Sequence, residues 1–95
     1  MLLIVEYFIK DQTSAATFKA ITKERRSAMK EAGCNKMGRY VNQDDSNHIV
    51  TMQRWISREH QAEYIKWTSA QPNNEEFHAC WAKPPRLTWV DKAEQ

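Results

Sequence analysis

The chain opens with an apolar segment, residues 2–9, whose hydrophobic side chains fall on both of its alternating faces. In an extended segment the odd-numbered and even-numbered residues point to opposite sides, and both sets are apolar apart from Glu6. The segment is also too short for a free-standing helix and rich in β-branched and aromatic residues. We therefore predict a strand whose sheet is covered on both faces.

The next segment has apolar residues at helical spacing. Thr13 or Ser14 is a suitable N-cap, and Gly33 supplies a stop after Ala32. Acidic residues are interleaved with the lysines and arginines on the remaining face, which indicates a solvated face rather than an anion site. The pattern predicts a long amphipathic helix from about residue 13 to Ala32.

A hairpin is predicted in the middle of the chain. Residues 34–42 and 48–56 are extended candidates, and the turn-forming residues 43–47 separate them. Ser57 then caps a second helix that reaches about Ala70. One stripe of this helix carries three rings, those of His60, Tyr64 and Trp67.

The last quarter of the chain is divided by prolines. Pro72 interrupts the second helix, residues 75–81 can form a short helical turn, and Pro84-Pro85 precedes a last strand at residues 87–90. We expect the tail after residue 91 to be loose. The order βαββαβ predicts one α+β domain over residues 1–95, ferredoxin-like, with a four-stranded antiparallel sheet and both main helices on one face.

Charge and composition exclude several classes of partner. The formal net charge is only +2 and the basic residues are scattered, so we expect no nucleic-acid or membrane ligand. Residues 48–55 also lack the glycine and paired rings of an RNA-binding strand. Cys34 and Cys80 are isolated, which indicates reduced thiols and a cytoplasmic location.

The sheet face that no helix covers still needs a partner. A second copy of the chain is the simplest one, because a face-to-face contact hides the same patch on both subunits and closes the assembly. We therefore expect a homodimer, with Val50 and Met52 among the interface residues.

The run Arg54-Trp55-Ile56-Ser57-Arg58-Glu59-His60, which follows an apolar strand, resembles the third-strand and second-helix junction of the antibiotic biosynthesis monooxygenase (ABM) family. Gly33 stands where that family usually has a glycine, and the resemblance extends over about residues 1–90. It implies a dimeric α+β barrel with a small pocket between sheet and helices in each subunit. Some members oxidise polycyclic phenols to quinones with molecular oxygen and no cofactor, others degrade haem, and many have no assigned activity.

The resemblance also implies candidate site residues. In the quinone-forming members the tryptophan matching Trp55 lines the pocket, with an asparagine and a tyrosine where this chain has Thr51 and Gln61. Tyr64 lies one helical turn beyond Gln61 and could replace the tyrosine. The expected walls of an aromatic-binding pocket are Trp55, Tyr64, Trp67, Thr51, Phe77 and Trp81.

A cofactor-independent oxidation needs a base and a partner for the oxyanion. Histidine is the side chain that changes charge near neutral pH, so His60 and His78 are candidate bases, and Arg54 or Arg86 could hold the oxyanion. Each of these residues also has a structural reading, as a packing residue, a helix-end residue or half of an ion pair.

Two alternatives stay open at this point. One is a non-catalytic dimeric barrel that binds a small aromatic ligand. The other is a haem-degrading relative, in which His78 would be the axial ligand. The histidines and cysteines lack the paired spacing of a metal site, so we expect no metal and no cofactor.

Overall fold

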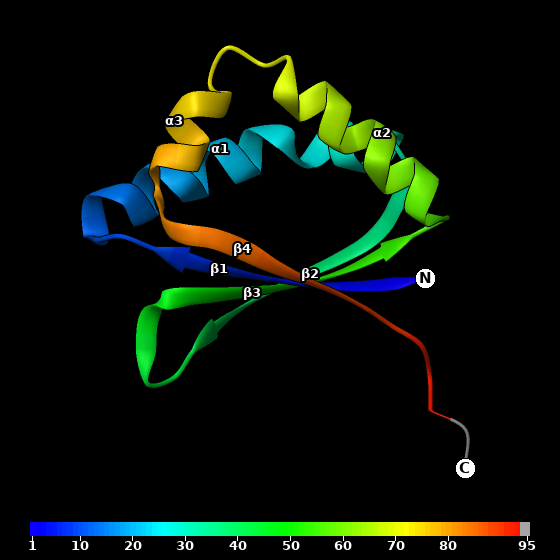
Figure 1. Ribbon diagram of the computed structural model, residues 1–95, viewed down its shortest axis with the longest axis horizontal. Coiled ribbons are helices and arrows are strands. Elements are labelled where there is room, and N and C mark those ends of the chain that lie inside the picture. The colour runs from blue at the N-terminus through cyan, green and yellow to red at the C-terminus, as the bar shows by residue number, and fades with distance from the viewer. Residues whose placement is uncertain (94–95) are drawn as a thin grey trace.

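The computed structural model describes residues 1–93 and has two layers, a sheet and a layer of helices (Figure 1). The four strands are β1 (Leu2–Ile9), β2 (Cys34–Asn42), β3 (Asp45–Trp55) and β4 (Trp81–Val90), and the three helices are α1 (Gln12–Glu31), α2 (Arg58–Ser69) and α3 (Asn74–Ala79). The strands form one antiparallel sheet in the order β2-β3-β1-β4. The ferredoxin-like α+β fold predicted from the sequence is confirmed.

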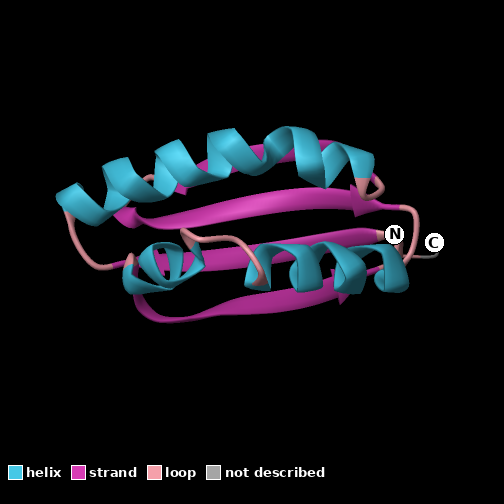
Figure 2. Ribbon diagram, turned by 90° about the horizontal axis from the view of Figure 1, so that it is seen from above, coloured by secondary structure: helices cyan, strands magenta, loops and turns pink. Residues whose placement is uncertain are grey.

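All three helices cover the same face of the sheet, and the other face is open (Figure 1). Seen from above, α1 forms one row, and α3 and α2 lie end to end in a second row beside it (Figure 2). The helix-facing side of β1 carries the buried Leu3, Val5 and Ile9, which is the odd-numbered set of the sequence pattern.

The core on the helix-facing side consists of two clusters. The first contains Ile9, Phe18, Ile21, Phe77 and Cys80, and lies where α1 and α3 meet the sheet. The second contains Leu3, Val5, Cys34 and Trp55. Tyr7 packs against both clusters, so it marks the boundary between them.

Of the two predicted helix starts, that of α2 is confirmed and that of α1 is wrong. Helix α2 begins as predicted, because Ser57 Oγ accepts a hydrogen bond from the backbone N–H of His60 at 3.2 Å. Helix α1 begins earlier than predicted: Asp11, not Thr13 or Ser14, is the N-cap, and its carboxylate accepts from the Ser14 N–H at 2.8 Å. Gly33 follows α1 with a φ of 120°, a conformation that favours glycine.

Two strands are longer than predicted. The β2–β3 turn comprises only residues 43–44, so β3 begins at Asp45 rather than at residue 48. Strand β4 begins at Trp81 and runs through Pro84-Pro85, which were predicted to precede the strand. Residues 91–93 have no regular structure, and the remainder of the predicted loose tail, residues 94–95, lies outside the described residues.

Candidate functional site

A cavity of about 210 Å³ lies between the sheet and the helices. All seven elements contribute side chains to its lining, from Val5 and Tyr7 on β1 to Trp81 and Leu87 on β4. Its lining includes Val5 from one core cluster and Phe77 from the other, so it occupies the space between the two. The division of the core therefore leaves room for a ligand.

Aromatic rings form one wall of the cavity. The ring centroids of Tyr7 and Phe77 are 6.3 Å apart, and those of Phe77 and Trp81 are 5.4 Å apart with nearly perpendicular planes. Tyr64 enters from α2 and packs against Trp55 at 5.6 Å. Rings in edge-to-face contact present both faces and edges to a guest, which is a suitable surface for an aromatic ligand.

A chain of hydrogen bonds runs along the helix-facing side of β3. Trp55 Nε1 donates to Gln53 Oε1 at 2.9 Å, and Gln53 Nε2 donates to Thr51 Oγ1 at 2.9 Å. All three residues are buried, and Trp55 is only 2% exposed. Each polar group orients the next, so Thr51 and Gln53 present fixed polar atoms to the cavity.

The charged groups of the cavity are all basic. Arg25 from α1 and Arg39 from β2 line it, and no aspartate or glutamate does among the described residues. Arg25 is buried, its Nη2 donates to Asn73 Oδ1 at 2.8 Å, and its guanidinium carbon lies 4.7 Å from the centroid of the Phe77 ring. Burial lowers the pKa of Arg25, but arginine keeps its charge in proteins.

Two tyrosines, Tyr7 and Tyr64, line this basic cavity. Burial raises the pKa of Tyr7 far above its ordinary value, with a smaller upward contribution from Tyr64, and outweighs the opposite effect of Arg25 and Arg39. Burial likewise raises the pKa of Tyr64. Both phenols therefore stay protonated at neutral pH and act as hydrogen-bond donors rather than as bases.

Several residues predicted from the sequence do line the cavity: Thr51, Tyr64, Phe77, His78 and Trp81. Trp55 lies one layer behind, where it supports Gln53 and Tyr64. His78 is solvent-exposed and stacks on Trp81 with ring centroids 4.5 Å apart, so it stands at the rim.

Two predicted residues belong to a separate hollow. His60 and Trp67 line a shallow, open depression along α2, with Tyr64 as the residue it shares with the cavity. The Nδ1 atom of His60 lies 2.7 Å from Ser57 Oγ, and a Cβ atom at Gly33 would meet the His60 ring at 3.0 Å. His60 therefore packs against Gly33 at the start of α2, and neither His60 nor Trp67 lines the cavity for which it was predicted.

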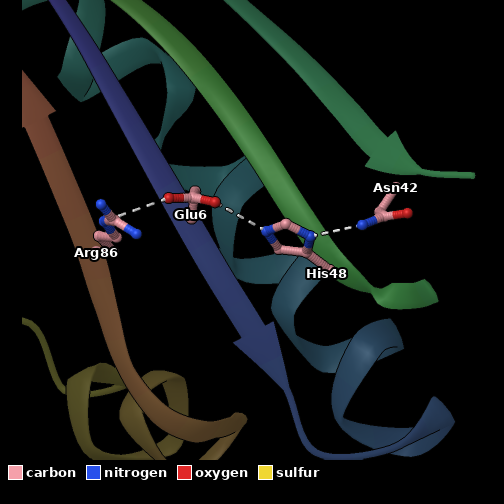
Figure 3. Close-up of polar contacts among 4 residues, drawn as sticks. All are labelled: Glu6, Asn42, His48 and Arg86. Atoms are coloured by element: carbon pink, nitrogen blue, oxygen red, sulfur yellow. Dashed lines mark hydrogen bonds and ion pairs between the residues drawn. The ribbon is translucent and has the colours of Figure 1, made fainter. Parts of the chain in front are cut away.

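The predicted oxyanion partners lie on the opposite side of the sheet. Arg54 alternates with the buried Gln53 and Trp55, so its exposed side chain points to the open face. Arg86 Nε lies 3.8 Å from Glu6 Oε2, in a row that continues to His48 and Asn42 (Figure 3). Neither arginine lines the cavity, whereas Arg25 and Arg39 do.

Sequence reasoning missed many of the cavity residues, and for three of them, Arg25, Tyr7 and Gln53, the patterns contained a signal. Arg25 follows Ile21 by four positions and Phe18 by seven, so it lies on the apolar stripe of α1. Tyr7 and Gln53 share the buried parity of their strands with Val5 and Trp55. The signal for these cavity residues was a polar side chain at a position of the apolar helix stripe or of the buried strand face.

Two further features of the described residues bear on the classes considered. Among residues 1–93, no three histidine, cysteine, aspartate or glutamate side chains lie close enough to share a metal ion. None of the helices in this part of the chain is long and apolar enough to cross a membrane.

Comparison with known proteins finds similarity at the level of structure. No family model and no curated protein matches the sequence. The fold matches a crystal structure of an antibiotic biosynthesis monooxygenase at 18% identity with a TM-score of 0.74, covering 99% of this chain and 100% of that one. A Bordetella bronchiseptica protein provisionally assigned to these monooxygenases gives 16% identity, a TM-score of 0.80 and coverages of 98% and 96%.

A third similar structure carries a described activity. SnoaB from Streptomyces nogalater, a cofactor-independent oxygenase, matches at 12% identity with a TM-score of 0.69, covering 97% of this chain and 93% of that one. Identities this low establish the fold alone. The class of protein is thus defined by architecture: the chain has the fold of the antibiotic biosynthesis monooxygenases, and the resemblance drawn from the sequence is confirmed at that level.

Proposed function

We propose that the protein is a homodimeric, cofactor-independent oxygenase that oxidises a small phenolic substrate with molecular oxygen. The observation that carries the proposal is the ring-lined cavity between sheet and helices, with Tyr7, Phe77 and Trp81 on one wall. The structural likeness to SnoaB supports the reaction class.

The size of the cavity indicates a substrate of one or two rings. An engineered cavity of roughly 150 Å³ holds one benzene molecule, and drug-sized ligands occupy roughly 300–1,000 Å³. At about 210 Å³ this cavity lies between these two sizes. A haem carries four pyrrole rings around its iron and needs more room than a cavity for one or two rings provides, so the haem-degrading alternative does not fit this cavity.

In the proposed reaction the phenol supplies the electrons. Loss of the hydroxyl proton gives a phenolate, which passes one electron to oxygen, and the resulting pair combines into a ring hydroperoxide. Loss of water from the hydroperoxide yields the quinone. One phenol and one O₂ thus give one quinone and one water, with no other reductant. His78, at the rim, would take the phenolic proton to solvent.

Oxygen uptake tests the proposal. One-ring, two-ring and three-ring phenols are supplied to the purified protein, with and without added flavin, iron or haem. We expect uptake without additives, with two-ring phenols accepted and three-ring anthrones poor because of the cavity size. The amount of quinone formed should equal the amount of oxygen consumed.

A matched pair of histidine variants locates the reaction. His78→Ala should lower the rate, whereas His60→Ala should leave it close to wild type, because His60 lies outside the cavity. Tyr64→Phe removes one cavity hydroxyl and is preferable to Trp55→Ala, since losing a fully buried tryptophan costs roughly 3–5 kcal/mol of stability. Equal losses in both histidine variants, or uptake only with an added cofactor, would contradict the proposal.

A non-catalytic ligand-binding barrel is the second candidate. The cavity favours this function because it lacks a buried general base. His78 is exposed, and no carboxylate lines the wall in the described part of the chain. Tight binding of a small aromatic compound, with no oxygen uptake from any phenol, would select this function.

The homodimer in the proposal rests on the open face of the sheet. Leu2, Ile4, Phe8 and Val50 are only half-buried there, and Met52 is 37% exposed. Apolar side chains gathered on one face, here crossed by the polar row of Arg86, Glu6 and His48, are typical of an interface. An isologous contact between two open faces would bury it in both subunits.

A further inference from the structure

Arg25 is a buried cation without an acidic partner. Its side chain is 5% exposed, and the ion pairs among residues 1–93 involve Glu6 and Glu63 but not Arg25. It contacts the neutral Asn73 amide and the Phe77 ring, and the nearby carboxylate of Glu24 is exposed and forms no ion pair with it. A buried charge without a counter-ion destabilises a fold, and an apolar side chain of similar size is usually the more stable choice.

The part of Arg25 that remains unsatisfied is its Nε–H. The Nη2 atom is used by Asn73, whereas Nε is fully buried without a hydrogen-bond partner. Two other cavity residues have the same property: Trp81 Nε1 and Asn74 Oδ1 are buried and unpartnered. Unsatisfied buried polar atoms are rare in folded proteins, and three of the four found among residues 1–93 belong to residues that line this cavity.

The two unsatisfied donors flank one ring. Arg25 stacks on Phe77 at 4.7 Å, and Phe77 and Trp81 are in edge-to-face contact at 5.4 Å. Arg39 adds a second positive charge, and its guanidinium is held by the Thr22 hydroxyl at the exposed end of the cavity. The cavity is therefore apolar and aromatic over most of its wall, and electropositive at the donors.

We infer that the ligand of this cavity is an aromatic oxyanion, a phenolate or a ring carboxylate, whose oxygen accepts the Arg25 Nε and Trp81 Nε1 donors. The inference rests on the proposed function only in taking the same cavity as the substrate site. Both oxyanions are planar and negatively charged, which matches a guanidinium beside aromatic rings. For a phenol, Arg25 would favour the ionised form, with the proton released to solvent.

Binding of small probes tests the charge preference directly. The probes are benzoate, its neutral isostere benzamide, and 4-nitrophenol, whose phenolate is coloured and whose phenol is not. We expect benzoate to bind roughly 10- to 100-fold more tightly than benzamide, the ratio expected for charge-assisted hydrogen bonds. Bound 4-nitrophenol should ionise at a lower pH than free 4-nitrophenol.

Substitutions in α1 test whether Arg25 causes the preference for benzoate over benzamide. Arg25→Met should abolish both the benzoate preference and the spectral shift, and Arg25→Lys should keep part of each because it keeps the charge. Arg26→Met is the matched control, since Arg26 is the exposed neighbour on the same helix and does not line the cavity. Without ligand, Arg25→Met should melt at the same temperature as wild type or higher, which separates loss of binding from loss of folding.

The outcomes distinguish this inference from the proposed function. Equal affinity for benzoate and benzamide, unchanged binding in Arg25→Met, or no binding of any probe by wild type would overturn the inference. Oxygen uptake from an uncharged phenol without an Arg25 effect would then keep the oxygenase and remove the oxyanion site. An Arg25-dependent anion preference without oxygen uptake would keep the site and contradict the oxygenase.

Discussion

Tyr7 lies where the two core clusters meet, and its phenol is kept protonated by burial. Because its pKa is raised above the ordinary value of 10.0, the folded state binds a proton that the unfolded state loses above that pH. The stability contributed by Tyr7 is thus complete below about pH 10 and declines as pH rises further, by about 1.4 kcal/mol per pH unit.

The prediction for Tyr7 concerns a difference between two proteins. Between pH 9 and 11, the free energy of unfolding of wild type should fall more steeply than that of Tyr7→Phe, measured by urea denaturation at each pH. The lysines and other tyrosines titrate in both proteins and cancel. Parallel curves would show that the Tyr7 phenol is as free to ionise in the folded state as in the unfolded chain.

Gln53 is predicted to stabilise the fold through its two hydrogen bonds. Gln53→Met keeps the size of the side chain but leaves Trp55 Nε1 and Thr51 Oγ1 without partners, at a cost of about 2 kcal/mol. Gln61→Met is the matched control, because Gln61 lines the same cavity from α2. In a Trp55→Phe background the cost of Gln53→Met should shrink, since the indole N–H is gone, and an unchanged cost would refute the role of this bond.

At the scale of single residues, the sequence contained information that the prediction did not use. Trp55 and Arg54 are adjacent in a strand, so once Trp55 is placed against the helices, Arg54 must face the other side. The two-residue period could therefore have excluded Arg54 from the pocket. By contrast, no spacing rule shows that Arg25 has no acidic partner, because that depends on which side chains the three helices bring to the cavity.

At the scale of elements, the start of α2 makes a measurable contribution. Ser57→Ala removes the oxygen that accepts the His60 N–H, and loss of such a cap costs about 1 kcal/mol of the free energy of unfolding. Ser69→Ala is the control, because Ser69 ends the same helix and its hydroxyl only donates back to the Ile65 carbonyl. Ser57→Asp should restore the stability. Equal effects of Ser57→Ala and Ser69→Ala in thermal unfolding would contradict the capping role.

The error in β4 has a physical cause in the sheet order. Proline removes a backbone donor and is excluded from central strands, so the sequence pattern predicts that Pro84-Pro85 precedes the strand. In the structure β4 is an edge strand, paired only with β1. The register also shifts between the pairs Glu6–Arg86 and Phe8–Lys83, so the two prolines fall in an irregularity. Edge position depends on topology, which a local pattern does not contain.

At the scale of the whole molecule, the two faces of the sheet serve different purposes. The helix-covered face holds the cavity and its basic groups, while the open face carries apolar side chains crossed by the polar row of Figure 3. The two-sided apolar pattern of β1 predicts apolar side chains on both faces, which the structure has, but it contains no signal for the cavity or for the polar row. Closure of the open face by a second copy would leave each cavity intact, because no cavity residue faces that side of β3.

The last prediction is that Met52→Glu converts the proposed homodimer into a folded monomer. Met52 lies on β3 opposite Ile4 of β1 and Gly38 of β2, on the open face. A carboxylate there would be desolvated without a partner in a face-to-face dimer, at a cost of several kcal/mol. In the monomer the same side chain is 37% exposed, so the fold itself should tolerate the charge.

Sedimentation and circular dichroism at micromolar concentration together test this prediction. Wild type should sediment as a dimer of the 11.2 kDa chain, and Met52→Glu as a monomer with unchanged helix content. Ile56→Glu is the control, because Ile56 is 61% exposed and follows the end of β3. The Ile56→Glu variant should remain dimeric. A monomeric wild type would refute the dimer. A dimeric Met52→Glu variant would place the interface elsewhere, since a buried charge on both subunits of an isologous contact counts twice.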